Sequence, residues 1–225
     1  MSDRKLLALS ALAGLGYGVL EVAGVVVGGA SNPVQYDIVP STAAAARIAA
    51  TPMPVGVWVG LGLEVVSTLL LIVFMVRATA AVRHADGHGL LATSALAAGI
   101  VNVAAVFVSF GLMAARNAAA GAGLDAQSVK LVADLNWGTY FLSWPSLAMF
   151  LGSLAVAAIR TRTLPAWLGW AGVVVAVLGL AGCLDPFNLG QIAQLLPIVW
   201  IPAAGISLAI RRTAVADPAP MMIPA

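Results

Sequence analysis

Residues 54–76 form an apolar run that contains one carboxylic acid, Glu64, near its middle. A helix needs about 20 apolar residues to cross a bilayer, so this run is long enough to do so. A carboxyl group that faces lipid at that depth costs on the order of a few kcal/mol. The small and polar residues that share one helical face with it are Gly56, Gly60, Ser67 and Thr68. We therefore expect Glu64 to face the inside of a helical bundle.

The composition of the whole chain is typical of a membrane protein. Of its 225 residues, 61% are hydrophobic and 9% are charged, whereas a soluble domain is typically about 25% charged. The net charge of +2 comes from basic residues at the ends of apolar segments and does not indicate nucleic-acid binding. A single cysteine, Cys183, excludes an internal disulfide and a multi-cysteine metal site. The lipid bilayer is thus the expected environment, and we predict no cofactor.

Six apolar segments are long enough to be membrane spans. We predict them at about residues 6–29, 54–76, 90–114, 136–159, 164–184 and 191–210, in one domain over residues 1–212. The predicted fold class is therefore an all-α, polytopic transmembrane bundle, followed by a disordered cytoplasmic tail at residues 213–225. The first segment follows Arg4 and Lys5, so it can also be read as a secretory signal whose cleavage would leave five spans. Its apolar length and its Glu21 favour a retained span.

The distribution of lysine and arginine predicts the orientation of these spans. If the N-terminus is cytoplasmic, eight basic residues near the ends of spans lie on the cytoplasmic side and three on the other. The eight are Arg4, Lys5, Arg77, Arg83, Arg160, Arg162, Arg211 and Arg212, and the three are Arg47, Arg116 and Lys130. Both termini are therefore predicted to be cytoplasmic.

Two connections on the outer side carry signals for helices. Ser41 precedes an alanine-rich stretch that ends at Pro52, which predicts a short helix. Asp125 can cap a second, amphipathic helix that turns Val129 and Leu135 toward the membrane. These two segments are candidates for a lid over the outer end of the bundle.

Polar side chains in several predicted spans fall at a similar depth. At a rise of about 1.5 Å per residue, Glu21 and Glu64 both lie slightly outward of the midplane, on faces rich in small residues. The residues that we assign to a candidate ligand-binding cavity are Tyr17, Glu21, Glu64, Asn102, Tyr140 and Asp185. Such a cavity would open outward and bind a small molecule or a lipid.

The same polar groups also have a structural interpretation. They can hydrogen-bond one another and hold the helices in register, and the spacing of Gly14, Gly18, Gly24 and Gly28 allows close helix contact. The alternative function is therefore a structural or regulatory subunit that packs against a membrane-protein partner through small-residue faces. A membrane enzyme that uses Glu21 and Glu64 as an acid–base pair is a third hypothesis.

The two histidines do not add a catalytic or metal site. His84 and His88 stand four residues apart, a spacing that can bind a metal on a helix. Gly87 and Gly89 instead favour a solvated cytoplasmic loop. Because both histidines are on the cytoplasmic side and the membrane acids lie outward, no catalytic set of His, Asp and Ser is expected to meet.

One short motif carries a family resemblance. Residues 162–172 read RTLPAWLGWAG, which resembles the R-x-L-P-x-W-L-G-W entry to the penultimate span of a family of small bacterial six-pass integral membrane proteins, catalogued as a domain of unknown function. The alanine-rich outer helix with Arg47 is also similar to that family. The resemblance implies a six-helix fold in a bacterial cytoplasmic membrane, and it brings no activity or site residues.

Overall fold

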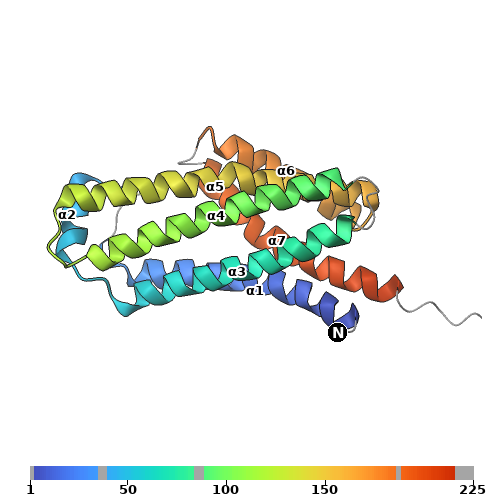
Figure 1. The fold of residues 1–225 in the computed structure, drawn as a ribbon, viewed down its shortest axis with the longest axis horizontal. Helices are drawn as coiled ribbons and strands as arrows, with labels where there is room; N and C mark the ends of the chain where they lie inside the picture. The colour runs from blue at the N-terminus through green and yellow to red at the C-terminus, as the bar shows by residue number, and fades with distance from the viewer. Residues whose placement is uncertain (1–2, 35–39, 84–88, 186–188, 216–225) are drawn as a thin grey trace, which may run out of the picture.

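The computed structural model describes residues 3–34, 40–83, 89–185 and 189–215. Within these ranges the chain forms seven helices and no strand (Figure 1). The helices are α1 (Asp3–Ser31), α2 (Thr42–Ala50), α3 (Val55–Arg83), α4 (Leu90–Ala119), α5 (Ala126–Thr161), α6 (Ala166–Gly182) and α7 (Leu189–Val215). The all-α prediction is confirmed for this part of the chain.

Among the described helices, α1, α3, α4, α5 and α7 are long and apolar enough to cross a membrane. The helix α6 is also apolar but has 17 residues. At about 1.5 Å per residue it is about 26 Å long, slightly less than the roughly 30 Å hydrocarbon core of a bilayer. The chain is therefore a helical membrane protein with five helices of spanning length.

The predicted outer helix after Asp125 and the predicted span at residues 136–159 are one continuous element. The helix α5 runs unbroken over 36 residues, with Pro145 inside it. Asp125 is its N-cap, and the carboxylate accepts hydrogen bonds from the Ser128 backbone N–H at 2.9 Å and from the Ser128 hydroxyl at 2.6 Å. The two predicted segments join because residues 126–136 contain no proline or glycine to end the helix.

Two other helices extend beyond the predicted spans. The helix α3 continues to Arg83, and α7 continues to Val215, so residues 213–215 of the predicted tail are helical. The remaining tail residues, 216–225, and the loop with His84 and His88 lie outside the described residues.

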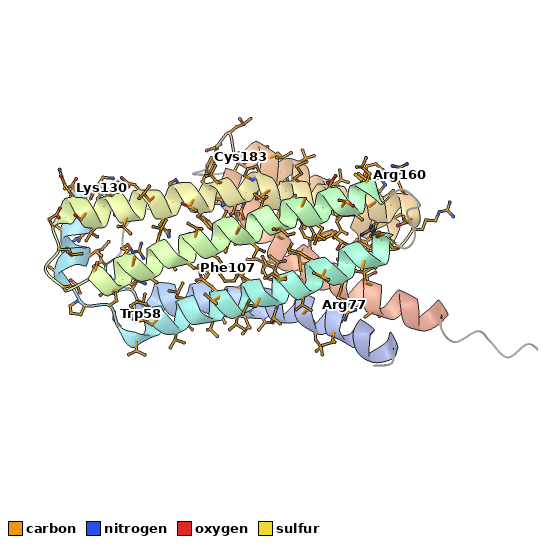
Figure 2. All side chains as sticks on the ribbon, in the orientation of Figure 1. Trp58, Arg77, Phe107, Lys130, Arg160 and Cys183 are labelled. Atoms are coloured by element: carbon orange, nitrogen blue, oxygen red, sulfur yellow. The ribbon has the colours of Figure 1, made fainter. Side chains whose placement is uncertain are left out.

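The membrane helices pack in a ring. The helix α1 contacts α3 and α7, α4 contacts α3 and α5, and α6 contacts α5 and α7. The start of α1 and the end of α7 lie at one end of the bundle, and α2 lies at the other (Figure 1). Figure 2 shows Arg77 and Arg160 toward the first end and Lys130 at the α2 end. The inner faces of several helices thus surround a common interior.

Glycines allow α1 to approach two of its neighbours closely. A Cβ atom on Gly18 would meet the Ile198 carbonyl oxygen and Pro202 Cγ of α7, each at 2.8 Å. A Cβ atom on Gly60 of α3 would meet Gly28 Cα at 2.5 Å. The small-residue faces of α1 are therefore occupied within the chain, one against α7 and the other against α3.

The short helix α2 is attached to the turn between α4 and α5. Its predicted cap is present, because the Ala44 backbone N–H donates to Ser41 Oγ at 3.2 Å. The side chain of Ile48 is fully buried in a small apolar cluster that also holds Val129 of α5. The Gly121 N–H, in the α4–α5 turn, donates to the α2 carbonyl of Ala49 at 2.8 Å. These contacts fix α2 at the end of the bundle opposite the start of α1 (Figure 1).

Candidate ligand-binding cavity

A cavity of about 320 Å³ lies inside the ring, between α1, α3, α4, α5 and α7. Five of the six residues that the sequence assigns to a site line it. These are Tyr17, Glu21, Glu64, Asn102 and Tyr140. Four different helices therefore bring the predicted polar groups to one place.

The two glutamates are held together by the packing of α1 against α3. A Cβ atom on Gly24 would meet Glu64 Cγ at 2.7 Å, so the glycine leaves room for the Glu64 side chain beside α1. The Ser67 hydroxyl of α3 donates to the Tyr17 carbonyl oxygen of α1 at 2.9 Å. The side chains of Glu21, Glu64 and Tyr140 line the same cavity, close enough for the charges of the two carboxyl groups to act on each other and on the Tyr140 hydroxyl.

Asn102 lines the cavity and carries a buried acceptor without a hydrogen-bond partner in the described structure. Its side chain is 2% exposed, and Oδ1 has no hydrogen-bond partner among the described residues. A buried acceptor that has lost its water costs about 1–3 kcal/mol if nothing replaces the bond. A hydrogen-bond donor inside the cavity would remove this cost, because Asn102 lines the same space as the two carboxyl groups.

A second asparagine, Asn136, has a structural role in the wall. Its Nδ2 donates to the Ser109 carbonyl oxygen at 2.9 Å and to Ser109 Oγ at 3.2 Å, which joins α5 to α4. About two turns later, the Ser143 hydroxyl donates to the Tyr140 carbonyl oxygen at 2.6 Å. The polar side chains of Asn136, Ser109 and Ser143 are thus already paired, in contrast to Asn102 Oδ1.

Asp185, the sixth predicted site residue, lies outside the cavity. It is exposed, and it does not line the cavity. It lies in the connection between α6 and α7, where its carbonyl oxygen accepts a hydrogen bond from the Gly190 N–H at 2.9 Å. Residues in a connection are not restricted to an inner helix face, so their position along the chain does not predict that they reach the interior.

The start of α7 supplies polar groups that the predicted site omitted. Gln191 and Gln194 both line the cavity. Their spacing of three residues places them on one helical face, which is a signal that the sequence contained. The lining residues Phe110 and Met113 could not be recognised in the sequence. They are apolar, and the residues around them in α4 are mostly apolar as well, so no pattern separates the cavity face from the other faces.

The mouth of the cavity lies at the face shared by α1 and α7. Val25 and Leu195 line the cavity and are 56% and 61% exposed, respectively. The α5 residues that line it begin at Asn136, and no α2 residue lines it. The predicted lid is therefore not found among the described residues, because α2 packs on the α4–α5 turn instead.

The basic residues at the α2 end of the bundle do not line the cavity. Among its described lining residues there is no lysine, arginine or histidine. Lys130 pairs with Asp134 at 2.8 Å, and the Arg116 guanidinium donates to Asn117 Oδ1 at 3.1 and 3.3 Å. Arg47 is exposed on α2. The charged side chains on the described cavity wall are consequently acidic, and the rest of the wall is polar, aromatic or aliphatic.

In the described part of the chain, no group of three or more His, Cys, Asp and Glu side chains is arranged to hold a metal ion. Comparisons with known proteins return no matching family model, no similar curated protein and no similar solved structure. The fold and the cavity therefore define the class, a helical membrane protein with a polar internal cavity. The likeness of residues 162–172 to a six-pass family stays a prediction.

Proposed function

We propose that this protein binds a small molecule or a lipid in the cavity between α1, α3, α4, α5 and α7. The observation that carries the proposal is the buried, unpaired Oδ1 of Asn102 in a wall that also holds Glu21 and Glu64. Polar and ionisable groups inside a membrane are costly and usually serve a function. The cavity volume of about 320 Å³ falls at the lower end of the range of about 300–1,000 Å³ for ligand pockets.

The proposal includes six crossings, with both termini on the cytoplasmic side of a bacterial membrane. The ring order supports α6 as the sixth crossing, because α6 packs between α5 and α7. Its exposed Trp167 and Trp170 suit a membrane interface. The start of α1 and the end of α7 lie at the same end (Figure 1), as an even number of crossings requires.

The same topology supports an outward-facing mouth. Gln191 and Gln194 lie in the first turns of α7, far from the end of that helix at Val215. If the end of α7 is cytoplasmic, these glutamines and the cavity that they line belong to the outer half of the bundle.

The alternative function, a structural or regulatory subunit, has less support. It depends on small-residue faces that are free to meet a partner protein. The faces formed by Gly14 and Gly18 and by Gly24, Gly28 and Gly60 are used within the chain, against α7 and between α1 and α3. The cavity is therefore the feature that best accounts for the polar residues.

A pair of variants at the mouth tests the proposal. Leu195→Trp narrows the mouth, whereas Val199→Trp places the same ring one turn away, on a residue that is 71% exposed and does not line the cavity. The protein in lipid nanodiscs is titrated with 2-phenylethylamine, 2-phenylethanol and phenylacetate, and the melting temperature is followed by tryptophan fluorescence.

We expect at least one of the three compounds to raise the melting temperature saturably in the parent and in Val199→Trp, and to lose this effect in Leu195→Trp. Equal shifts in all three proteins would indicate partitioning into lipid and would contradict the proposal, as would the absence of any shift.

A further inference from the structure

We infer that the ligand is an organic cation, with an ammonium group beside Glu21 and Glu64 and an apolar body directed toward the α1–α7 mouth. This inference rests on the proposed function and names its ligand class. It depends on the charge of the cavity wall, on its hydrogen-bonding groups and on its rings.

The charge of the wall favours a cation. The ionisable lining residues are Glu21 and Glu64, together with the phenols Tyr17 and Tyr140, and no basic side chain lines the cavity among the described residues. A charge taken into a membrane interior needs an opposite charge close by. An anionic ligand would find none on this wall, whereas an ammonium group would find two carboxyl groups from two helices.

The hydrogen-bonding groups also match an ammonium. A primary ammonium group has three N–H donors and no acceptor. The wall offers acceptors on three helices, namely Glu21 of α1, Glu64 of α3 and the unpaired Oδ1 of Asn102 on α4. Because Asn102 Oδ1 is an acceptor, the group that it lacks is a donor. An ammonium would satisfy it, and a carboxylate ligand would not.

The remaining wall fits the rest of an amphiphilic cation. The rings of Tyr17, Tyr140 and Phe110 line the cavity, and aromatic faces attract cations within about 6 Å. At the mouth the exposed lining residues Val25 and Leu195 are apolar, and the third exposed lining residue, Gln191, is polar. An amine with an aromatic or aliphatic body therefore meets acids inside and apolar side chains near the lipid.

The three probes share a phenyl group and differ in the charge of the group attached to it. Their relative affinities for the parent protein therefore test the inference. We expect 2-phenylethylamine, the cation, to bind at least about tenfold more tightly than 2-phenylethanol, a difference of about 1.4 kcal/mol, and phenylacetate to be the weakest. Glu21→Gln and Glu64→Gln should each weaken binding of the amine by about tenfold. Neither change should alter the affinity for the alcohol. Asp185→Asn also replaces an acid by its amide, but at an exposed position outside the cavity, and it should leave the affinity for the amine unchanged.

The outcomes separate this inference from the proposed function. If the alcohol or phenylacetate binds as tightly as the amine and Leu195→Trp abolishes that binding, the cavity binds ligands but the cation assignment is wrong. Amine binding that survives both Gln variants would also overturn the assignment. If no probe binds, the proposed function fails, and this inference fails with it.

Discussion

At the scale of single residues, two asparagines on the cavity wall, the buried Asn102 and the partly buried Asn136, have opposite environments. Asn136 is hydrogen-bonded to Ser109 of the neighbouring helix, whereas Asn102 Oδ1 has no partner in the described structure. A buried polar group without a partner reduces stability, so its presence is best explained by a ligand. We therefore expect the same substitution to have different effects on stability at Asn102 and at Asn136.

Asn102→Leu should leave the melting temperature in nanodiscs equal to that of the parent or higher, because it removes an unpaired acceptor. It should also weaken binding of 2-phenylethylamine by about tenfold. Asn136→Leu is the matched control, and it should lower stability by about 1–2 kcal/mol because two hydrogen bonds are lost. A larger destabilisation at Asn102 than at Asn136 would show that Asn102 has a structural role.

At the scale of helices, the contact between α1 and α3 positions both glutamates. The glycine spacing in the sequence indicated close helix contact for α1, because the approach of two helices depends on small side chains that recur every turn, but it did not identify α3 as the partner. The sequence did not predict the length of α5. The boundary was placed at Asn136, where polar residues enter the apolar pattern, yet polarity alone does not end a helix.

Gly60→Ala tests the α1–α3 contact. The added Cβ atom would meet backbone atoms of Gly28, which have no side-chain freedom with which to move aside. We expect a loss of about 1–3 kcal/mol, as for other overpacked sites. Gly62→Ala, two residues along α3, meets nothing within 4 Å and should be neutral or slightly stabilising. Equal effects of the two changes in a thermal melt would exclude close α1–α3 packing.

The cap of α5 makes a pH-dependent prediction. Hydrogen bonds from the Ser128 hydroxyl and then from its backbone N–H hold the pKa of Asp125 below its ordinary value. Since the pKa is lower in the folded state, the carboxylate stabilises the fold above the unfolded-state pKa, and this contribution is lost as the pH falls through the folded-state pKa.

The melting temperature of the parent should therefore exceed that of Asp125→Ala at about pH 7, and the difference should shrink toward about pH 3. A difference that stays constant over this range would mean that the charge of Asp125 does not contribute to the cap.

At the scale of the whole molecule, hydropathy predicts the helices and only part of the site. Glu21, Glu64 and Asn102 were assigned correctly to the interior, because an ionisable or amide group in an apolar helix is costly outside it. Asp185 does not line the cavity, since a connecting segment is under no such constraint. The mouth between α1 and α7 was not predicted, because it depends on which helices are neighbours in the ring, and single-sequence patterns do not contain that order.

The central claim is that water and solutes reach an outward-facing cavity lined by Glu21 and Glu64, and thiol labelling in intact cells tests it most directly. Ser143 is 3% exposed and lines the cavity, whereas Ser146 of the same helix does not line it. Burial raises the pKa of the native Cys183 thiol, and Cys183→Ala removes it as a competing site.

In that background, a membrane-impermeant, cationic methanethiosulfonate reagent added outside the cells should label Ser143→Cys rapidly and Ser146→Cys slowly. Prior addition of 2-phenylethylamine should slow labelling at Ser143→Cys. If Ser143→Cys reacts only after the protein is unfolded, or reacts no faster than Ser146→Cys, the outward-facing cavity does not exist.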